Sequence, residues 1–211
     1  MAEAHDARTG QSGARGARTP YTGNSMSYPD PGRPDFCARC ATRLHSEPRG
    51  GRDRPVCPAC YWVYYAKPAL GAAILVEQDD RVLLVQRAHD PYLGQWMLPA
   101  GFVEYGEFAQ ESAVREALEE TGLRVELQGI FGFYFGVDDP RNVAHLCVYV
   151  ATVIGGTLTA GDDASDARFF ARDARPAPIA FAAHRQTLAD WAGGPRPQAP
   201  LANAPEGLRR E

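Results

Sequence analysis

Three glutamates crowd one short stretch of the chain, and this feature constrains the fold most. The stretch REALEETG (115–122) places Glu116, Glu119 and Glu120 on one face of an expected helix, with Gly122 where a left-handed residue would end it. Like charges at this spacing cost roughly a few tenths of a kcal/mol per pair. Mg²⁺ would reverse that cost, because it prefers carboxylate oxygens and shares its shell with waters and phosphates. The stretch predicts a metal-binding helix, with a solvated acidic face as the common alternative.

The flanking residues favour the metal site. The segment GFVEYGEFAQESAVREALEETGL (101–123) fits the pattern G-x5-E-x7-R-E-U-x-E-E-x-G-U at every fixed position, with Ala117 and Leu123 in apolar slots. This segment resembles the signature of the Nudix hydrolases. The resemblance implies an α/β Nudix fold, a mixed sheet sandwiched between helices. It also implies Mg²⁺-dependent (or Mn²⁺-dependent) hydrolysis of a diphosphate in a nucleotide-derived small molecule.

The resemblance also implies the roles of individual residues in the metal site. Glu116 and Glu120 would be the main Mg²⁺ ligands, Glu119 would assist, and the backbone carbonyl of Ala100 would add a ligand from the preceding loop. A dication at such a site neutralises phosphate charge and lowers the pKa of bound water.

Arg115 is expected to brace this face. The resemblance pairs it with Glu107, but eight helical residues span roughly 12 Å, so Glu107 must lie in a loop that folds back before the helix begins. Glu111 and Glu119 lie four residues to either side of Arg115 and are further candidate partners. We expect Gly101 and Gly106 to give this loop its flexibility.

The base that activates water is left open by the sequence. It can be one of the signature glutamates or an acid in the later loop GDDASDARFF, which offers Asp163 and Asp166. A polar turn before a strand explains either aspartate equally well.

Four cysteines precede this region in two pairs with the spacing C-x2-C-x16-C-x2-C. They are Cys37, Cys40, Cys57 and Cys60. Two such knuckles complete an all-thiolate tetrahedral site typical of structural Zn²⁺. About thirty residues bury little apolar area, so metal binding must supply folding energy. Paired disulfides are the alternative, and they are rare in a reducing compartment. Cys147 is expected to be a buried core residue.

The ribbon formed by these cysteines is basic, yet nucleic acid is not an expected partner. Its arginines are Arg39, Arg43, Arg49, Arg52 and Arg54. The chain as a whole has a formal net charge of −4, which gives no global positive field. The nearby aromatic residues are expected to pack the ribbon against the hydrolase domain. They are Tyr61, Trp62, Tyr64 and Tyr65.

Composition divides the chain into four parts. We predict a disordered tail over 1–34, the zinc ribbon over 35–65, the Nudix domain over 66–192 and a disordered tail over 193–211. Translation could start at Met26 rather than Met1. Within the Nudix domain we expect strands at 69–76, 81–87, 131–137, 143–154 and 167–171, and a helix at 108–120. A closing helix carries the apolar stripe Phe181, His184, Leu188 and Trp191.

The absence of one motif narrows the range of candidate substrates. A zinc ribbon before a Nudix domain resembles bacterial NADH pyrophosphatases, which carry a motif close to S-Q-P-W-P-F-P, and the segment after Leu123 has nothing like it. DPYLGQWMLPAGFVEYGE and PIAFAAHRQTLADW look like the shorter zinc-ribbon ADP-ribose and FAD pyrophosphatases. Phe133, Tyr134 and Phe135 could stack on a base, but at least two of them are expected in the core.

Other functions stay open at this stage. NADH, nucleoside triphosphates or an RNA cap are alternative substrates, and a nucleic-acid-binding or regulatory protein on a Nudix scaffold is the non-enzymatic alternative. The resemblance suggests a homodimer. The chain shows neither an apolar run of about 20 residues nor a secretory signal, so we expect a cytoplasmic protein without a membrane partner.

Overall fold

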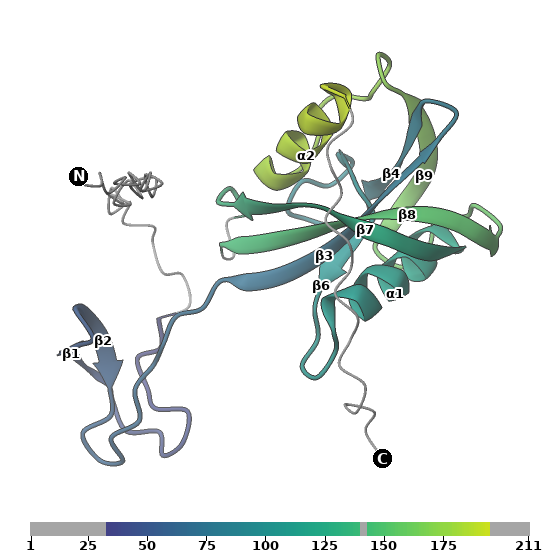
Figure 1. Cartoon of the computed structure of the whole chain (residues 1–211). Coiled ribbons are helices and arrows are strands. Elements are labelled where there is room, and N and C mark those ends of the chain that lie inside the picture. Colours follow the sequence, from purple (N-terminus) through teal and green to yellow (C-terminus); the bar gives the residue numbers. More distant parts are fainter. Residues whose placement is uncertain (1–32, 140–142, 195–211) are drawn as a thin grey trace, which may run out of the picture.

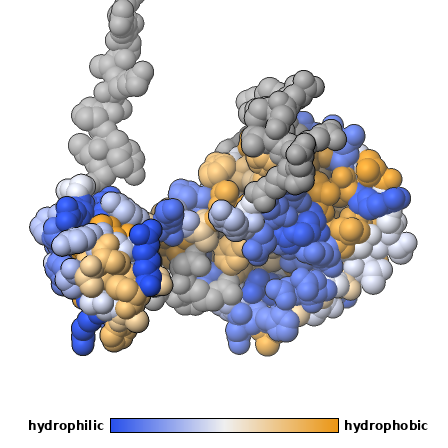
Figure 2. Space-filling view, turned by 90° about the horizontal axis from the view of Figure 1, so that it is seen from below, coloured by the Kyte–Doolittle hydropathy of each residue, from blue (hydrophilic) through white to orange (hydrophobic). Residues whose placement is uncertain are grey.

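The computed structural model describes residues 33–139 and 143–194. The predicted terminal tails, apart from their few inner residues, and the alternative start at Met26 lie outside the described residues. The described chain forms a small two-stranded element and a larger domain in which helices cover a sheet (Figure 1). In Figure 2 the first element is the small lobe beside the larger domain.

The small element is a ribbon built from β1 (His45–Arg49) and β2 (Arg52–Val56). The two strands are antiparallel, with His45 opposite Val56, and the chain turns between them at Gly50 and Gly51. The sequence analysis did not predict these strands, because HSEPR and RDRPV contain prolines and charges and lack an alternating apolar pattern.

The larger domain contains one mixed sheet. Its strands are β3 (Ala69–Gln78), β4 (Arg81–Arg87), β5 (Trp96–Met97), β6 (Ala100–Phe102), β7 (Leu123–Gly136), β8 (Ala144–Gly156) and β9 (Ala164–Ala171). The order is β5-β4-β3-β8-β7, while β6 pairs with β3 and β9 pairs with β4. Strands β3 and β8 are parallel and the other pairs are antiparallel, so the prediction of a mixed sheet is confirmed.

Strand β3 is central and apolar, and its segment from Gly71 to Val76 is buried. It reverses into β4 through Asp79 and Asp80, which both have positive φ, as tight hairpins require. Strand β7 is longer than the predicted 131–137. It begins at Leu123, directly after the first helix, and three register shifts bend it along β8. Polar residues and bulges hide its alternation in the sequence.

Two helices cover opposite faces of the sheet (Figure 1). Helix α1 (Ala109–Thr121) packs Ala113 and Ala117 into a core that includes Ile74 and Cys147. Helix α2 (Ala182–Ala192) packs Leu188 and Trp191 into a second core that includes Leu75 and Leu84. The predicted sandwich is therefore confirmed. Neither helix of the described residues is long and apolar enough to span a membrane.

Candidate active site

Helix α1 begins just after the loop that carries Glu107, as the length argument requires. The backbone N–H of Phe108 donates to Glu111 Oε2 at 2.9 Å, and the hydroxyl of Ser112 donates to the carbonyl of Phe102 at 3.2 Å. These bonds fix the first turn and attach it to β6. Glu111 therefore closes the helix N-terminus, and the expected pair between Glu111 and Arg115 is not formed.

Arg115 connects the loop to the acidic face. Its guanidinium donates to both oxygens of Glu107, at 2.8 and 3.0 Å. Its Nη1 donates to Glu116 Oε1 at 2.6 Å and to Glu119 Oε2 at 2.8 Å. The hydrogen bonds to Glu107, opposed by burial, raise the pKa of Arg115, and the same bonds lower the pKa of Glu107. This charged brace ties helix α1 to the loop that carries Glu107.

Glu120 is the most buried acid of the face, with 2% of its surface exposed. Its Oε2 accepts a hydrogen bond from the Ala100 backbone N–H at 2.9 Å. Burial raises the pKa of Glu120 to about 8, and the negative charges of Glu116 and Asp163 add to the rise. The hydrogen bond from Ala100 and the charge of Arg87 oppose this rise only in part, and a hard dication would supply the remaining compensation.

Glu116 lies against the backbone of Gly101. A Cβ built on Gly101 would lie 2.0 Å from Glu116 Oε1, so a side chain at this position would displace the Glu116 carboxylate. Burial raises the pKa of Glu116 against the opposing effect of Arg115. The sequence analysis assigned Gly101 a flexible backbone. The structure gives a different reason for this glycine, which is the space that the carboxylate of Glu116 occupies.

The loop before β9 places its acids differently. Asp166 lies on β9 and is ion-paired with Arg168. Asp163 is exposed, 3.7 Å from His89 Nε2, and its charge acts on Glu120. Asp162, which the sequence analysis did not single out, acts electrostatically on Glu116. Of the two predicted aspartates, Asp163 is therefore the one that the structure brings to the acidic face.

The carboxylates of this face suit a hard dication by their chemistry, although three of their oxygens do not lie within 4.8 Å of one another in this structure. Glu116 and Glu119 both turn toward Arg115. Among the described residues, only the four cysteines form a group of three or more possible ligands within 4.8 Å of one another. The fit of the glutamates rests on the buried carboxylate of Glu120 and the half-buried carboxylate of Glu116, whose pKa values are raised and which adjoin the backbone of Ala100 and Gly101.

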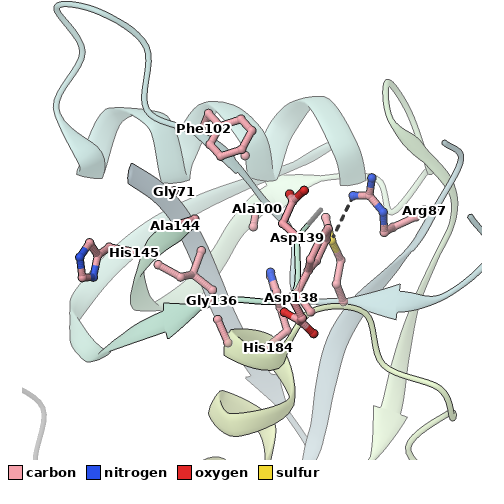
Figure 3. A pocket seen from close by; sticks show the side chains of 15 residues that line it. Gly71, Arg87, Ala100, Phe102, Gly136, Asp138, Asp139, Ala144, His145 and His184 are labelled. Atoms are coloured by element: carbon pink, nitrogen blue, oxygen red, sulfur yellow. Dashed lines mark hydrogen bonds between the residues drawn. The ribbon is translucent and has the colours of Figure 1, made fainter. Parts of the chain in front are cut away.

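A pocket of about 110 Å³ opens beside Ala100 and Gly101. Figure 3 shows Gly136, Asp138 and His184 on the side near α2, with Ala100 and Phe102 across from them. Phe181 and Ala183 add to the wall. A pocket next to the acidic face can hold the part of a ligand that extends away from a metal-bound group.

The four cysteines converge in two matching turns. The backbone N–H of Ala41 donates to the carbonyl of Cys37 at 2.9 Å, and Tyr61 bonds to Cys57 in the same way at 3.0 Å. Both Ala41 and Tyr61 have positive φ. Sulfur-to-sulfur contacts of 3.5 Å join Cys37 to Cys60 and Cys40 to Cys57, and all four thiols are free.

The ionisation of these thiols also points to a cation. Hydrogen bonds with Thr42 lower the pKa of Cys40 to about 6. The backbone of Trp62 favours the thiolate of Cys60, but burial and the three neighbouring sulfurs outweigh it and raise that pKa to about 12. Four such sulfurs become thiolates together only with a cation among them, and the ligand set suits Zn²⁺. The predicted four-cysteine cluster is confirmed.

Two expectations about aromatic residues are wrong. Of the three after the first helix, only Tyr134 is buried, while Phe133 and Phe135 are 61% and 45% exposed beside His145. In the ribbon, Tyr61 and Tyr65 are exposed instead of packing on the larger domain.

The remaining ribbon aromatics contact groups of the ribbon itself. Trp62 lies against Tyr64, and the guanidinium of Arg54 lies 4.6 Å above the ring of Tyr65. Tyr65 therefore has a partner within the ribbon.

Comparisons with known proteins agree with this geometry. A family model for the NUDIX domain matches residues 67–191. An ADP-ribose pyrophosphatase of Methanocaldococcus jannaschii is 44% identical over 107 residues, which cover 50% of this chain and 63% of that protein. An NAD-capped RNA hydrolase NudC of Chromobacterium violaceum is 33% identical over 155 residues, which cover 71% of this chain and 56% of that protein.

A solved structure gives a closer match in coverage. The crystal structure of a NUDIX hydrolase from Nitrosomonas europaea aligns with a TM-score of 0.67 and 30% identity, over 75% of this chain and 90% of that one. The chain spans less than two thirds of the length of the two curated relatives, 63% and 56%.

Proposed function

The chain belongs to the Nudix family, and from that premise we propose that it is a Mg²⁺-dependent (or Mn²⁺-dependent) hydrolase. It cleaves the diphosphate of a nucleoside diphosphate linked to a second group. One observation carries the proposal: a buried glutamate, Glu120, and a half-buried one, Glu116, both with raised pKa values, adjoin the backbone of Ala100 and Gly101, which line a pocket.

Each residue of the face has a proposed role. Glu116 and Glu120 hold the dication, Glu119 assists, and the Ala100 carbonyl is a candidate ligand. When bound, the dication neutralises diphosphate oxygens and makes water a stronger nucleophile. The brace between Arg115 and Glu107 keeps the helix and the loop in one arrangement before substrate arrives.

A carboxylate must also accept the proton of the attacking water. Asp163 is the favoured base, because it is exposed and its charge reaches Glu120, whereas Asp166 is occupied by Arg168. Glu119 is the alternative, because 42% of its side chain is exposed and it lies on the face itself. Removal of a proton by a positioned carboxylate is general base catalysis.

ADP-ribose or FAD is the proposed substrate, with AMP and a phosphorylated second group as products. The similarity to an ADP-ribose pyrophosphatase supports ADP-ribose. The similarity to an NAD-capped RNA hydrolase keeps NADH and capped RNA as a second candidate, although the extra motif of the NADH enzymes is missing. The division into a ribbon over 35–65 with structural Zn²⁺ and a catalytic domain over 66–192 belongs to the same proposal. A homodimer and a cytoplasmic location stay predictions.

A panel of ADP-ribose, FAD, NADH and diadenosine polyphosphates, each with Mg²⁺ or Mn²⁺ and with product analysis, tests the reaction. Glu120→Gln should lower kcat/KM by roughly 100-fold or more, since it removes a charge that holds the dication. Glu126→Gln is the matched control, because Glu126 is an exposed acid on β7 outside the site. Unchanged turnover in Glu120→Gln would overturn the assignment of the metal face.

A further inference from the structure

The pocket beside Ala100 favours an uncharged ring. Asp138 and Asp139 line it together with one cation, Arg87, whose guanidinium donates to the carbonyls of Pro91 and His89. The acidic face of α1 adjoins the same wall through Ala100 and Gly101, so a second phosphate group would meet more negative than positive charge. Small residues line the pocket where the sheet meets α2, including Gly136, Ala144 and Ala183, so little side-chain volume fills this part of it. A planar, neutral part of the substrate matches both properties.

One polar group inside this pocket has half of its hydrogen-bonding capacity unused. His184 is 5% exposed and lines the pocket. Its Nδ1 accepts a hydrogen bond from the backbone N–H of Leu98 at 3.3 Å. A nitrogen that accepts carries no proton, so the neutral ring has its proton on Nε2. Among the described residues no acceptor is recorded for Nε2–H, which makes it a buried donor that a ligand can satisfy.

The tautomer is secured by the surroundings of His184. Burial, with the nearby positive charges of Arg87 and Arg185, outweighs the attraction of Asp138 and lowers the pKa of His184 to about 3, so the ring stays neutral near pH 7. A neutral ring with Nδ1 occupied donates through Nε2 alone.

Helix α2 is held in place before any ligand binds. Asp138 accepts hydrogen bonds from the backbone N–H of Ala182 at 2.8 Å and from Arg185 Nη2 at 2.6 Å. The hydroxyl of Tyr92 donates to the carbonyl of Asp138 at 2.7 Å. These contacts fix the first turn of α2, and the ring of His184 is fixed with it. A donor held in this way gives specificity at little ordering cost.

We infer that His184 is a specificity-determining residue whose Nε2–H donates to an acceptor on an uncharged ring of the substrate, which lies in the pocket between Ala100 and Gly136. The inference rests on the proposed function, because the ring is one side of the diphosphate that the acidic face cleaves. A ligand without an acceptor at this point would leave the buried N–H unpaired, and the pocket would discriminate against it.

Two substitutions separate the two nitrogens of the ring. In His184→Asn the amide oxygen can still accept from Leu98, but nothing donates into the pocket. In His184→Gln the amide nitrogen can reach the position of Nε2 and donate, while the Leu98 N–H loses its acceptor. We expect His184→Asn to raise KM about tenfold with kcat retained. His184→Gln should keep KM near the wild-type value while its Tm falls below that of His184→Asn.

Steady-state kinetics with Mg²⁺, on the compound of the panel that the wild type hydrolyses fastest, measures KM and kcat, and thermal melting measures Tm. His45→Asn is the matched control, because His45 lies in the ribbon away from the pocket. Equal KM changes in the two His184 variants, or a change in kcat alone, would overturn the inference.

A second variant keeps the test decisive if the His184 variants do not fold. A Cβ at Gly136 would lie 3.7 Å from the Ala144 oxygen and 3.8 Å from Ala183 Cβ, which is ordinary contact, so Gly136→Ala should fold and narrow the pocket. The KM of this variant should rise, and an unchanged KM would show that the ring does not bind in this pocket. A wild type that hydrolyses no compound of the panel overturns the proposed function and this inference together. Normal turnover with unchanged KM in His184→Asn overturns the inference alone.

Discussion

The ribbon and the Nudix domain each bring several acidic side chains of one type close together, thiols in the ribbon and carboxylates in the Nudix domain. The two parts are held together by different forces. The interior of the ribbon consists of cysteine sulfurs and a few apolar residues such as Val56. The Nudix domain has apolar clusters on both faces of its sheet. The difference suggests that the ribbon needs its metal in order to fold, whereas the Nudix domain folds on its own core and needs metal for chemistry.

The thiols and the glutamates also differ in how the repulsion among them is relieved. In the ribbon, proton binding limits the repulsion, because the pKa of Cys60 is raised to about 12 while that of Cys40 is lowered to about 6. The glutamates are contained by Arg115, which stays charged and bonds to three of the acids around it. The ion pairs of Arg115 therefore hold the loop and helix α1 of the Nudix domain together whether or not metal and substrate are bound.

The largest expected effect is loss of the ribbon on removal of zinc. Structural Zn²⁺ contributes on the order of 10 kcal/mol in small cysteine sites, so Cys57→Ser or a strong chelator should unfold residues 35–65. The melting transition of the Nudix domain should stay in place. Zinc analysis and limited proteolysis measure the first effect, and circular dichroism the second. Cys147→Ser, in the sheet, is the control that keeps zinc. Normal ribbon folding in zinc-free Cys57→Ser would break the comparison.

A matched pair of leucine substitutions sharpens the same comparison at a smaller scale. Leu84 is fully buried under α2, and Leu84→Ala should lower the free energy of unfolding of the Nudix domain by about 3 kcal/mol. Leu44 is a half-buried residue of the ribbon, and Leu44→Ala should leave the transition of the Nudix domain unchanged. Urea unfolding followed by tryptophan fluorescence measures both. Equal losses would mean that the two parts unfold as one unit.

The third expected effect is a pH dependence of the metal-free Nudix domain. Burial raises the pKa of Glu120 to about 8 from an ordinary 4.5, so the folded state holds this proton more tightly than the unfolded state. The contribution is therefore fully present below pH 4.5 and is lost as the pH rises through about 8. Stability should fall by at most about 1.4 kcal/mol per pH unit within that window.

Melting curves from pH 5 to about pH 9 in a chelator, for the wild type and Glu120→Gln, measure this slope. The variant should lack the part due to Glu120, and saturating Mg²⁺ should remove that part from the wild type. Identical slopes in the two proteins without metal would show that Glu120 does not titrate in this range.

The sequence predicted the parts of the site that repeat a local pattern. Helix spacing was sufficient to place Glu116, Glu119 and Glu120 on one helix, and helix length was sufficient to place Glu107 in a returning loop. Contacts between segments that are distant in the sequence could not be predicted from it. Leu98 and His184 are 86 residues apart, and the hydrogen bond between them leaves no trace in the spacing of either motif.

The errors have a common physical origin. Phe133 and Phe135 alternate as a strand requires, but alternation does not tell which face is covered, and helix α1 does not cover their end of the sheet. The ribbon aromatics were expected in an interface because aromatic rings usually avoid water. Here local partners suffice, such as Arg54 for Tyr65. Glu111 was available both to Arg115 and to the helix N-terminus, and its carboxylate accepts from the backbone N–H of Phe108.

The contact between Gly101 and Glu116 has a consequence for tracing this protein through evolution. A single methyl group at position 101 would occupy the place of a carboxylate oxygen. A descendant that replaces this glycine could retain every acid of the helix and still shift the carboxylate of Glu116 away from the backbone of residue 101. Position 101 is therefore worth following together with the glutamates when relatives of this domain are compared.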